Sequence, residues 1–252
     1  MRYEVCLEIG SVVSGPSEPS RWEAEETKRV LSARAWVPAL PGCYCEAASE
    51  EEALVRLPAV IGEYLAWLRS HGEEAPTGGA CEVVVVERLE TPAGRSEPSF
   101  AADRVPTAEE DVERTIRHMA YARQDLLALV SHLPDAVLDW QPAPDKWSAR
   151  GILAHIASAD GYYRTSLLDK PPEQEPPEER FDLALQRERA ISHLRSLAPD
   201  QRSQVFHPNW PWRGDEDEEW PVRKALRRFI YHERFHTRDI QQTLAWLVMG
   251  GP

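Results

Sequence analysis

The chain has 252 residues, of which 42% are apolar and 28% charged, and its formal net charge at pH 7 is −13. This composition fits one large or two ordinary folded domains and excludes a disordered chain. The acidic balance argues against nucleic-acid and anionic-membrane partners, which need basic side chains. The chain has no run of ~20 apolar residues and no signal-peptide pattern. We therefore expect a cytoplasmic protein that acts on a small-molecule substrate.

The cysteines and histidines divide the chain into two parts. The four cysteines lie within the first 81 residues, whereas seven of the eight histidines follow residue 117. A disulfide framework is not expected without an export signal, and the cysteine spacing lacks the pairs of a four-thiolate zinc site. We interpret the cysteines as small buried strand residues. Residues 91–106 hold three prolines and no periodic pattern, which predicts a linker between domains at 1–90 and 107–252.

The first domain is predicted to be α+β, with a small antiparallel sheet and one long helix. Residues 2–9 alternate between polar and apolar side chains, as in a half-buried strand. Residues 14–32 begin as a loop with room for a short acidic helix, and strands are expected at 34–38, 43–47 and 81–89. A capping box at Ser49 and Glu52 predicts a helix that ends at 71–72. Pro58 predicts a kink or a break within that helix.

This region resembles the HicB-like family over about 40 residues. The resemblance is carried by four segments of the sequence: Pro38-Ala39-Leu40-Pro41-Gly42-Cys43, Ser49-Glu50-Glu51-Glu52-Ala53, Ile61-Gly62-Glu63-Tyr64-Leu65 and Gly72-Glu73. It implies a sheet of three or four strands with one long helix. Antitoxin members of the family add a DNA-binding part, but the sequence shows no such segment and its charge is unsuited to DNA. An accessory domain that docks or self-associates is therefore expected.

The second domain is predicted to be an all-α, up-down-up-down four-helix bundle. Apolar stripes at helical spacing occur at residues 107–133, 148–168, 178–197 and 221–249. Thr107 with Glu110 has the form of a capping box, and Ser148 is a plausible N-cap. The long loop at 199–220 contains three tryptophans, and such loops often cover the mouth of a site.

Three histidines of this domain lie on apolar stripes. His232 and His236 are four residues apart, so one turn of helix places them on the same side. His155 lies on the apolar stripe of the second helix. Buried imidazoles are costly unless they bind something. Three of them on facing helices can bind a divalent ion and leave open positions for water or substrate. The simpler alternative for a His-x-x-x-His pair is exposure or ordinary hydrogen bonding.

The segment His232-Glu233-Arg234-Phe235-His236 also matches the H-E-x-x-H pattern of zinc proteases, with Glu233 as the general base. That class normally needs a third ligand downstream. Sixteen residues follow His236, and none is His, Glu or Cys, although Asp239 lies on the same helix. A peptidase is therefore not expected.

Residues 107–249 resemble the DinB-like metal-binding four-helix bundles. The resemblance is carried by Trp140-Gln141-Pro142-Ala143-Pro144-Asp145-Lys146-Trp147-Ser148, by Ile152-Leu153-Ala154-His155-Ile156, and by the histidine pair ahead of Arg238, Ile240 and Gln241. It implies that the metal ligands are His155, His232 and His236. The segment Thr237-Arg238-Asp239 differs from many relatives, which have a glycine after the arginine where this chain has Asp239. Characterised relatives include S-transferases and isomerases that use bacillithiol or mycothiol, so the resemblance implies a metal site but no particular reaction.

The expected mechanism uses Zn²⁺, or else Ni²⁺, Mn²⁺ or Fe²⁺, on the three imidazoles. The ion would lower the pKa of a low-molecular-weight thiol for attack on an electrophile, or activate water for hydrolysis. Asp160 and Glu233 are candidates to orient the imidazoles.

The arginines that could hold a substrate carboxylate are Arg164, Arg234 and Arg238. Residues that could line the site, but are more simply explained by packing, are Tyr121, Tyr162, Tyr163 and His118. The catalytic candidates are Glu233, Asp160 and Arg238, while His132, His193 and His207 are expected at the surface or in loops.

A second hypothesis is a non-enzymatic stress-related or regulatory protein that forms a homodimer through the bundle and holds a structural metal. A structural ion is closed by a fourth protein ligand, whereas a catalytic ion keeps an exchangeable position. The candidates for such a fourth ligand are His118, Asp160 and Glu233. The fourth position therefore distinguishes the two hypotheses.

Overall fold

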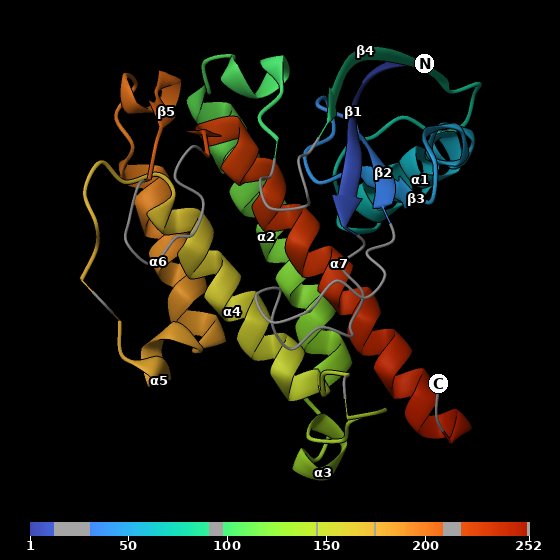
Figure 1. Cartoon of the computed structure of the whole chain (residues 1–252), viewed down its shortest axis with the longest axis vertical. Coiled ribbons are helices and arrows are strands. Elements are labelled where there is room, and N and C mark those ends of the chain that lie inside the picture. Colours follow the sequence, from blue (N-terminus) through green and yellow to red (C-terminus); the bar gives the residue numbers. More distant parts are fainter. Residues whose placement is uncertain (13–30, 91–97, 145, 174, 209–217, 251–252) are drawn as a thin grey trace.

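The computed structural model describes residues 1–12, 31–90, 98–144, 146–173, 175–208 and 218–250. A small sheet with one helix packs beside a group of long helices (Figure 1). The segment 14–32, where a loop with a short acidic helix is expected, lies outside the described residues except for its last two, which begin a strand. The first part of the linker, Trp210 and Trp212 also lie outside the described residues. Within the described parts, no helix is both long enough and apolar enough to cross a membrane.

The N-terminal sheet is mixed and not wholly antiparallel as predicted. Its strands are β1 (Arg2–Val12), β2 (Leu31–Trp36), β3 (Tyr44–Ala47) and β4 (Glu82–Glu90), in the spatial order β3-β2-β1-β4. Neighbours pair antiparallel except β1 and β4, which are parallel. The alternation of side chains along a strand is the same in either direction, so the sequence pattern could not reveal the direction of β4.

Helix α1 (Glu50–Ser70) covers one face of the sheet. Ser49 Oγ accepts the Glu52 N–H at 3.1 Å, which confirms the predicted N-cap. The helix is unbroken at Pro58, so the predicted break there is wrong. The side chains that α1 buries toward the sheet are Ala53, Leu57, Ile61, Tyr64, Leu65 and Leu68.

Three of the four cysteines are core residues of this domain, as predicted, whereas Cys81 is not. Cys6, Cys43 and Cys45 are buried, Cys81 is half-buried, and all four thiols are free. Burial raises the pKa of the Cys6 and Cys43 thiols to about 12. These two side chains are therefore neutral at physiological pH and serve as small apolar residues rather than as thiolate nucleophiles.

The second domain consists of four long helices: α2 (Glu109–Val130), α4 (Ala149–Thr165), α6 (Leu183–Ser196) and α7 (Val222–Met249). Ser148 caps α4 as predicted, whereas α2 follows Ala108, whose N–H is accepted by Asp111, so the predicted cap at Thr107 is wrong. The predicted helix at 178–197 is interrupted after α5 (Pro177–Arg180), where Asp182 caps α6. The shorter elements are η2 (Ala101–Arg104), α3 (Asp135–Leu138), η3 (Gln201–Ser203), β5 (Val205–Phe206) and β6 (Trp220–Pro221).

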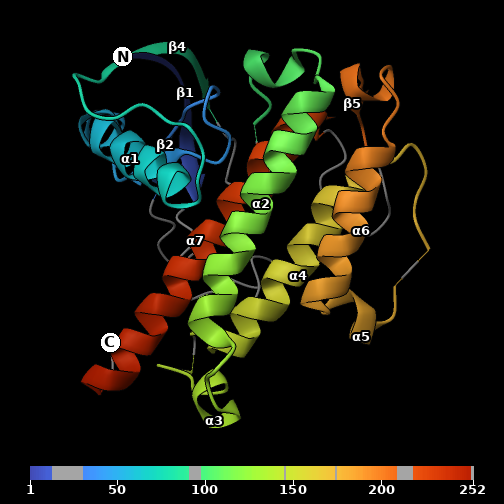
Figure 2. The ribbon, with the colours of Figure 1, turned by 180° about the vertical axis from the view of Figure 1, so that it is seen from behind.

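The bundle does not have the predicted up-down-up-down order. Helices α4 and α6 run in the same direction. Two contacts show this: Asp160 pairs with Arg187, and farther toward the C-terminal ends of both helices His193 bonds the Leu167 carbonyl. Helices α2 and α7 are also parallel to each other, and both views show them side by side (Figures 1 and 2). The order is therefore down-up-up-down. An apolar stripe identifies the buried face of a helix but carries no information on its direction. The connection at 166–182 is long enough for the chain to run back from the end of α4 to the other end of the bundle, where α6 begins.

Helix α7 also covers the second face of the sheet, so that the two domains share it. The Tyr231 ring lies 4.3 Å from the Tyr44 ring and 5.0 Å from the Trp36 ring, measured between centroids. Arg227 stacks on Trp36 and holds Asp103 of η2 through two nitrogens at 3.0 Å. The second half of the predicted linker thus packs on α7.

We expect Gly42→Ala to weaken this domain contact. Gly42 has φ +85°, and an added Cβ would lie 2.6 Å from Ile230 Cγ2 on α7. Overpacking and left-handed strain together should lower the free energy of unfolding by about 2–4 kcal/mol, measured by urea denaturation. Gly72→Ala is the matched control, because Gly72 has φ +86° but nothing within 4 Å, and should cost only about 1 kcal/mol. Equal losses would show that the contact with Ile230 is unimportant.

Candidate metal centre

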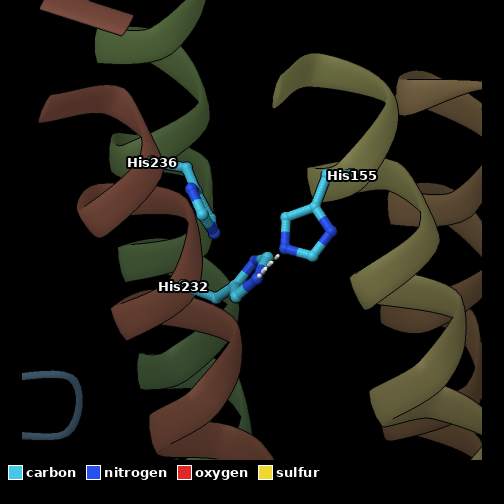
Figure 3. Close-up of side chains that lie close together, drawn as sticks. All are labelled: His155, His232 and His236. Carbon is cyan, nitrogen blue, oxygen red and sulfur yellow. Dashed lines mark hydrogen bonds between the residues drawn. The ribbon is translucent and has the colours of Figure 1, made fainter. Parts of the chain in front are cut away.

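The three predicted histidines come together between α4 and α7. Their ligand nitrogens all lie within 4.8 Å of one another, and His155 Nε2 lies 3.0 Å from His232 Nε2 (Figure 3). His232 and His236 stand one turn apart on α7, with ring centroids 4.4 Å apart. The antiparallel packing of α4 on α7 brings His155 opposite this pair.

The surroundings of the imidazoles are largely apolar and aromatic. His232 and His236 are buried, and His155 is half-buried. The Trp147 ring lies 4.7 Å from the His155 ring, and the Tyr163 ring lies 5.7 Å from the His232 ring. Because these rings displace water from one side of the group, the nitrogens form a partly shielded donor set.

The donor set fits a divalent ion. With Zn–N bonds of about 2.0–2.1 Å, two nitrogens of a tetrahedral site lie about 3.3 Å apart. The observed separations, from 3.0 Å up to 4.8 Å, differ from that value by amounts that small side-chain rotations can close. Among the described residues, this group contains only the three imidazoles and no carboxylate or thiol. Such a set leaves at least one coordination position for water or substrate.

Asp239 orients one of the imidazoles. His236 Nδ1 lies 2.8 Å from Asp239 Oδ2, one turn farther along α7. This contact engages Nδ1 and leaves Nε2 for a metal, an arrangement common around metal-binding histidines. This role of Asp239 is not among the roles predicted from the sequence, although its spacing of three residues from His236 on one helix was the available signal.

Asp160 and Glu233 bond to arginines, not to the imidazoles as the sequence analysis expected. Arg187 donates to Asp160 Oδ2 at 2.8 Å and also to Glu233, and Arg123 pairs with both carboxylates. Both carboxylates and Arg187 are almost completely buried. Burial raises the pKa of the Asp160 carboxyl against the opposing effect of Arg187. The network joins α2, α4, α6 and α7 beside the metal centre.

The candidate substrate arginines are separated in the structure. Arg164 pairs with Glu175 at 2.6 Å, and the Arg234 guanidinium stacks on Trp67 at 4.2 Å. Arg238 is exposed. Of the candidate tyrosines, Tyr163 lies beside His232, whereas the Tyr121 and Tyr162 hydroxyls donate to Glu73 and Glu218, respectively.

His118 faces the N-terminal domain and not the metal centre. Its ring lies 6.1 Å from the Trp67 ring of α1 and 6.0 Å from the Tyr121 ring. Burial lowers the pKa of His118 to about 4, although the nearby Glu73 carboxylate acts in the opposite direction. The remaining histidines of the bundle lie elsewhere: His132 and His207 are exposed, and His193 bonds the Leu167 carbonyl.

Comparisons with known proteins bear on both domains. Residues 118–240, which include all three clustered histidines, match the family model of the DinB superfamily. A segment of 49 residues, 19% of the chain, is 39% identical to the UPF0150 protein Ta0767 of Thermoplasma acidophilum and spans 71% of that protein. Over this segment the chain belongs to the UPF0150 family. This short match lends limited support to a HicB-like N-terminal domain.

One solved structure is also similar to this chain. It is YfiT from Bacillus subtilis, described as a probable metal-dependent hydrolase with an unusual four-helix bundle topology. The two chains are 19% identical, and the match covers 64% of this chain and 97% of YfiT with a TM-score of 0.43.

We predict that His118 makes the folded protein sensitive to acid. Because its pKa is lowered from about 6.5 to about 4, its contribution to stability is complete above pH ~6.5 and is lost as the pH falls toward 4. Over this window the wild type should lose about 1–3 kcal/mol more unfolding free energy than His118→Gln, measured by urea denaturation at each pH. Carboxylates titrate in both proteins, so the comparison isolates His118. Parallel curves would contradict the prediction.

We predict that Asp239→Asn weakens zinc binding about 10–100-fold, because the His236 ring loses its anionic partner. Competition with a chromogenic chelator measures this affinity. Asp125→Asn is the matched control, since Asp125 makes the same kind of contact with His71, at 3.1 Å, outside the metal centre. An unchanged affinity in Asp239→Asn would mean that the carboxylate does not support the site.

Proposed function

We propose that the helical domain is a divalent-metal-dependent enzyme that acts on a small molecule. One observation carries this proposal: three imidazoles converge from two helices, and their group contains no fourth His, Cys, Asp or Glu side chain among the described residues. A structural ion would be closed by such a donor. The match of residues 118–240 to the DinB superfamily, which spans all three histidines, supports the proposal.

The roles of the chain's own residues follow from their contacts. His155, His232 and His236 would hold the ion, and Asp239 fixes the ring of His236 through Nδ1. A bound divalent ion supplies Lewis acidity, which lowers the pKa of a coordinated water or thiol. The arginine–carboxylate network joins α4 to α7, and Trp147 limits access of water on one side.

We propose that the reaction is either hydrolysis or the transfer of a low-molecular-weight thiol. Zinc is the preferred ion, and Ni²⁺, Fe²⁺ and Mn²⁺ are alternatives. Imidazole is a good ligand for zinc, nickel and iron, whereas manganese favours oxygen ligands. The cysteines of the chain are no source of that thiol, because all four lie in the other domain and none belongs to the histidine group. Burial also raises the pKa of Cys6 and Cys43 to about 12. A thiol reaction therefore requires an external thiol. Cytoplasmic location and a homodimer remain predictions from the sequence.

Two alternatives have less support. A zinc protease needs Glu233 as its base, but Glu233 is 1% exposed and paired with Arg123 and Arg187. A structural ion needs a fourth ligand, but Asp160 and Glu233 bond to arginines and His118 faces α1.

Protein purified without chelators should contain about one divalent ion per chain, measured by mass spectrometry. His232→Ala and His236→Ala should contain almost none. His132→Ala is the matched control, because His132 is exposed and outside the group, and should keep its metal. Folded wild type that takes up no ion after soaking with zinc, nickel, manganese or iron would refute the proposal.

Cobalt substitution distinguishes a catalytic ion from a structural one. In an open site, an added thiol such as 2-mercaptoethanol should bind the cobalt and produce a sulfur-to-cobalt charge-transfer band, because a coordination position is available. A spectrum that does not change with added thiol or anion would indicate a closed site and favour the non-enzymatic hypothesis. A positive result justifies assays of thiol transfer and hydrolysis on small electrophiles.

A further inference from the structure

A cavity of about 280 Å³ lies between the two domains, at the beginning of α2 and α7. It is separate from the metal centre, because none of the three histidines lines it and its last residue on α7, Arg227, lies five positions before His232, about 7.5 Å along the helix. Small-ligand pockets begin at about 300 Å³, so the cavity suits a compact ligand. Its walls include Trp36 and Phe100 from the first part of the chain and Leu226 from the bundle.

Thr115, one of the residues that line this cavity, has a buried hydroxyl group without a partner among the described residues. Thr115 is 1% exposed, and its Oγ1 makes no hydrogen bond among the described residues. A threonine within a helix normally bonds the carbonyl four residues earlier. An unpaired buried hydroxyl is costly, and a ligand with a polar group in the cavity would satisfy it.

The cavity wall contains more positive than negative charge. Three arginines line it, Arg114, Arg223 and Arg227, together with the carboxylates of Asp103 and Asp111. Arg227 is held by Asp103 with two nitrogens at 3.0 Å. Arg223 donates to the Val105 and Pro106 carbonyls, both at 2.9 Å, and to Asp111.

Arg114 is the lining arginine with the greatest freedom to turn toward a ligand. Its side chain is 43% exposed, and it pairs with Asp111, one turn away on the same helix. Exposed pairs of this kind contribute little. If Arg114 turned away, Asp111 would keep its ion pair with Arg223. A ligand anion can therefore recruit Arg114 without leaving a buried carboxylate unpaired.

From these features we infer that the cavity binds a small organic carboxylate with an apolar body. The Arg114 guanidinium and the Thr115 hydroxyl bind the carboxylate, and Trp36, Phe100 and Leu226 contact the apolar body. The first turn of α7, which contains no acidic residue, adds a favourable field for an anion. Because the walls come from both domains, the ligand also strengthens the domain contact.

Calorimetric titration of the full chain with benzoate tests this inference, with benzamide as the neutral probe of the same shape. Wild type should bind benzoate with a Kd on the order of 1 mM and benzamide at least about tenfold more weakly. Benzoate should also raise the melting temperature, since it binds only the folded state. Arg114→Gln should weaken benzoate binding about tenfold, and Thr115→Val about fivefold.

Two features keep the test independent of folding. Thr115→Val removes an unpaired buried hydroxyl at nearly constant shape, so this variant should be as stable as the wild type. Arg150→Gln is the matched control, because Arg150 is an exposed arginine paired with Asp135 and Asp139 elsewhere in the bundle, and it should bind benzoate like the wild type. Equal binding of benzoate and benzamide, equal binding by wild type and Arg114→Gln, or no binding at about ten times the expected Kd would each overturn the inference.

Discussion

The packing of α7 against two partners at once is the constraint on which the rest of the molecule depends. Successive residues of a helix point about 100° apart, so neighbouring positions face different partners. Tyr231 packs on Trp36 and Tyr44 of the sheet, whereas the adjacent His232 faces His155 of α4. A shift or rotation of α7 that improved one contact would therefore disturb the other. The position of the two α7 imidazoles is set from the sheet side as well as from the bundle.

The buried ion network next to His232 restricts the same helix from the bundle side. Two arginines and two carboxylates are costly to remove from water, and apolar side chains of similar size would often give equal stability. Apolar contacts, however, are tolerant of small sliding movements, whereas Arg187 reaches both Asp160 and Glu233 only at one register of α4, α6 and α7. The network is thus better explained by the alignment of helices around the donor set than by stability. Because Glu233, next to the candidate ligand His232, is paired with two arginines, it is poorly placed to act as a general base.

The sequence predicted the features that depend on one element or on short spacing. Helical periodicity identified the inward faces that carry His155, His232 and His236, and local caps located Ser49 and Ser148. It did not predict the parallel pairing of β4, the down-up-up-down order of the helices, or the arginine partners of Asp160 and Glu233. These features depend on long-range pairing. An apolar stripe or an alternating strand has the same pattern whichever way it runs. A buried arginine cannot be recognised from the sequence, because its burial depends on a carboxylate partner that is distant along the chain.

The role of the N-terminal domain follows from what it contacts. It adds no donor to the metal centre among the described residues, yet its sheet and α1 cover the side of α7 that faces away from His155. Asp103 and Phe100 extend this contact to the first turns of α7. There the Arg227 guanidinium donates to Asp103 and stacks on the rings of Trp36 and Phe100. A domain that resembles a self-associating or docking module thus docks within its own chain. Its contact surface lies against the helix that carries two of the three donors, so the domain contact and the geometry of the centre are mechanically linked.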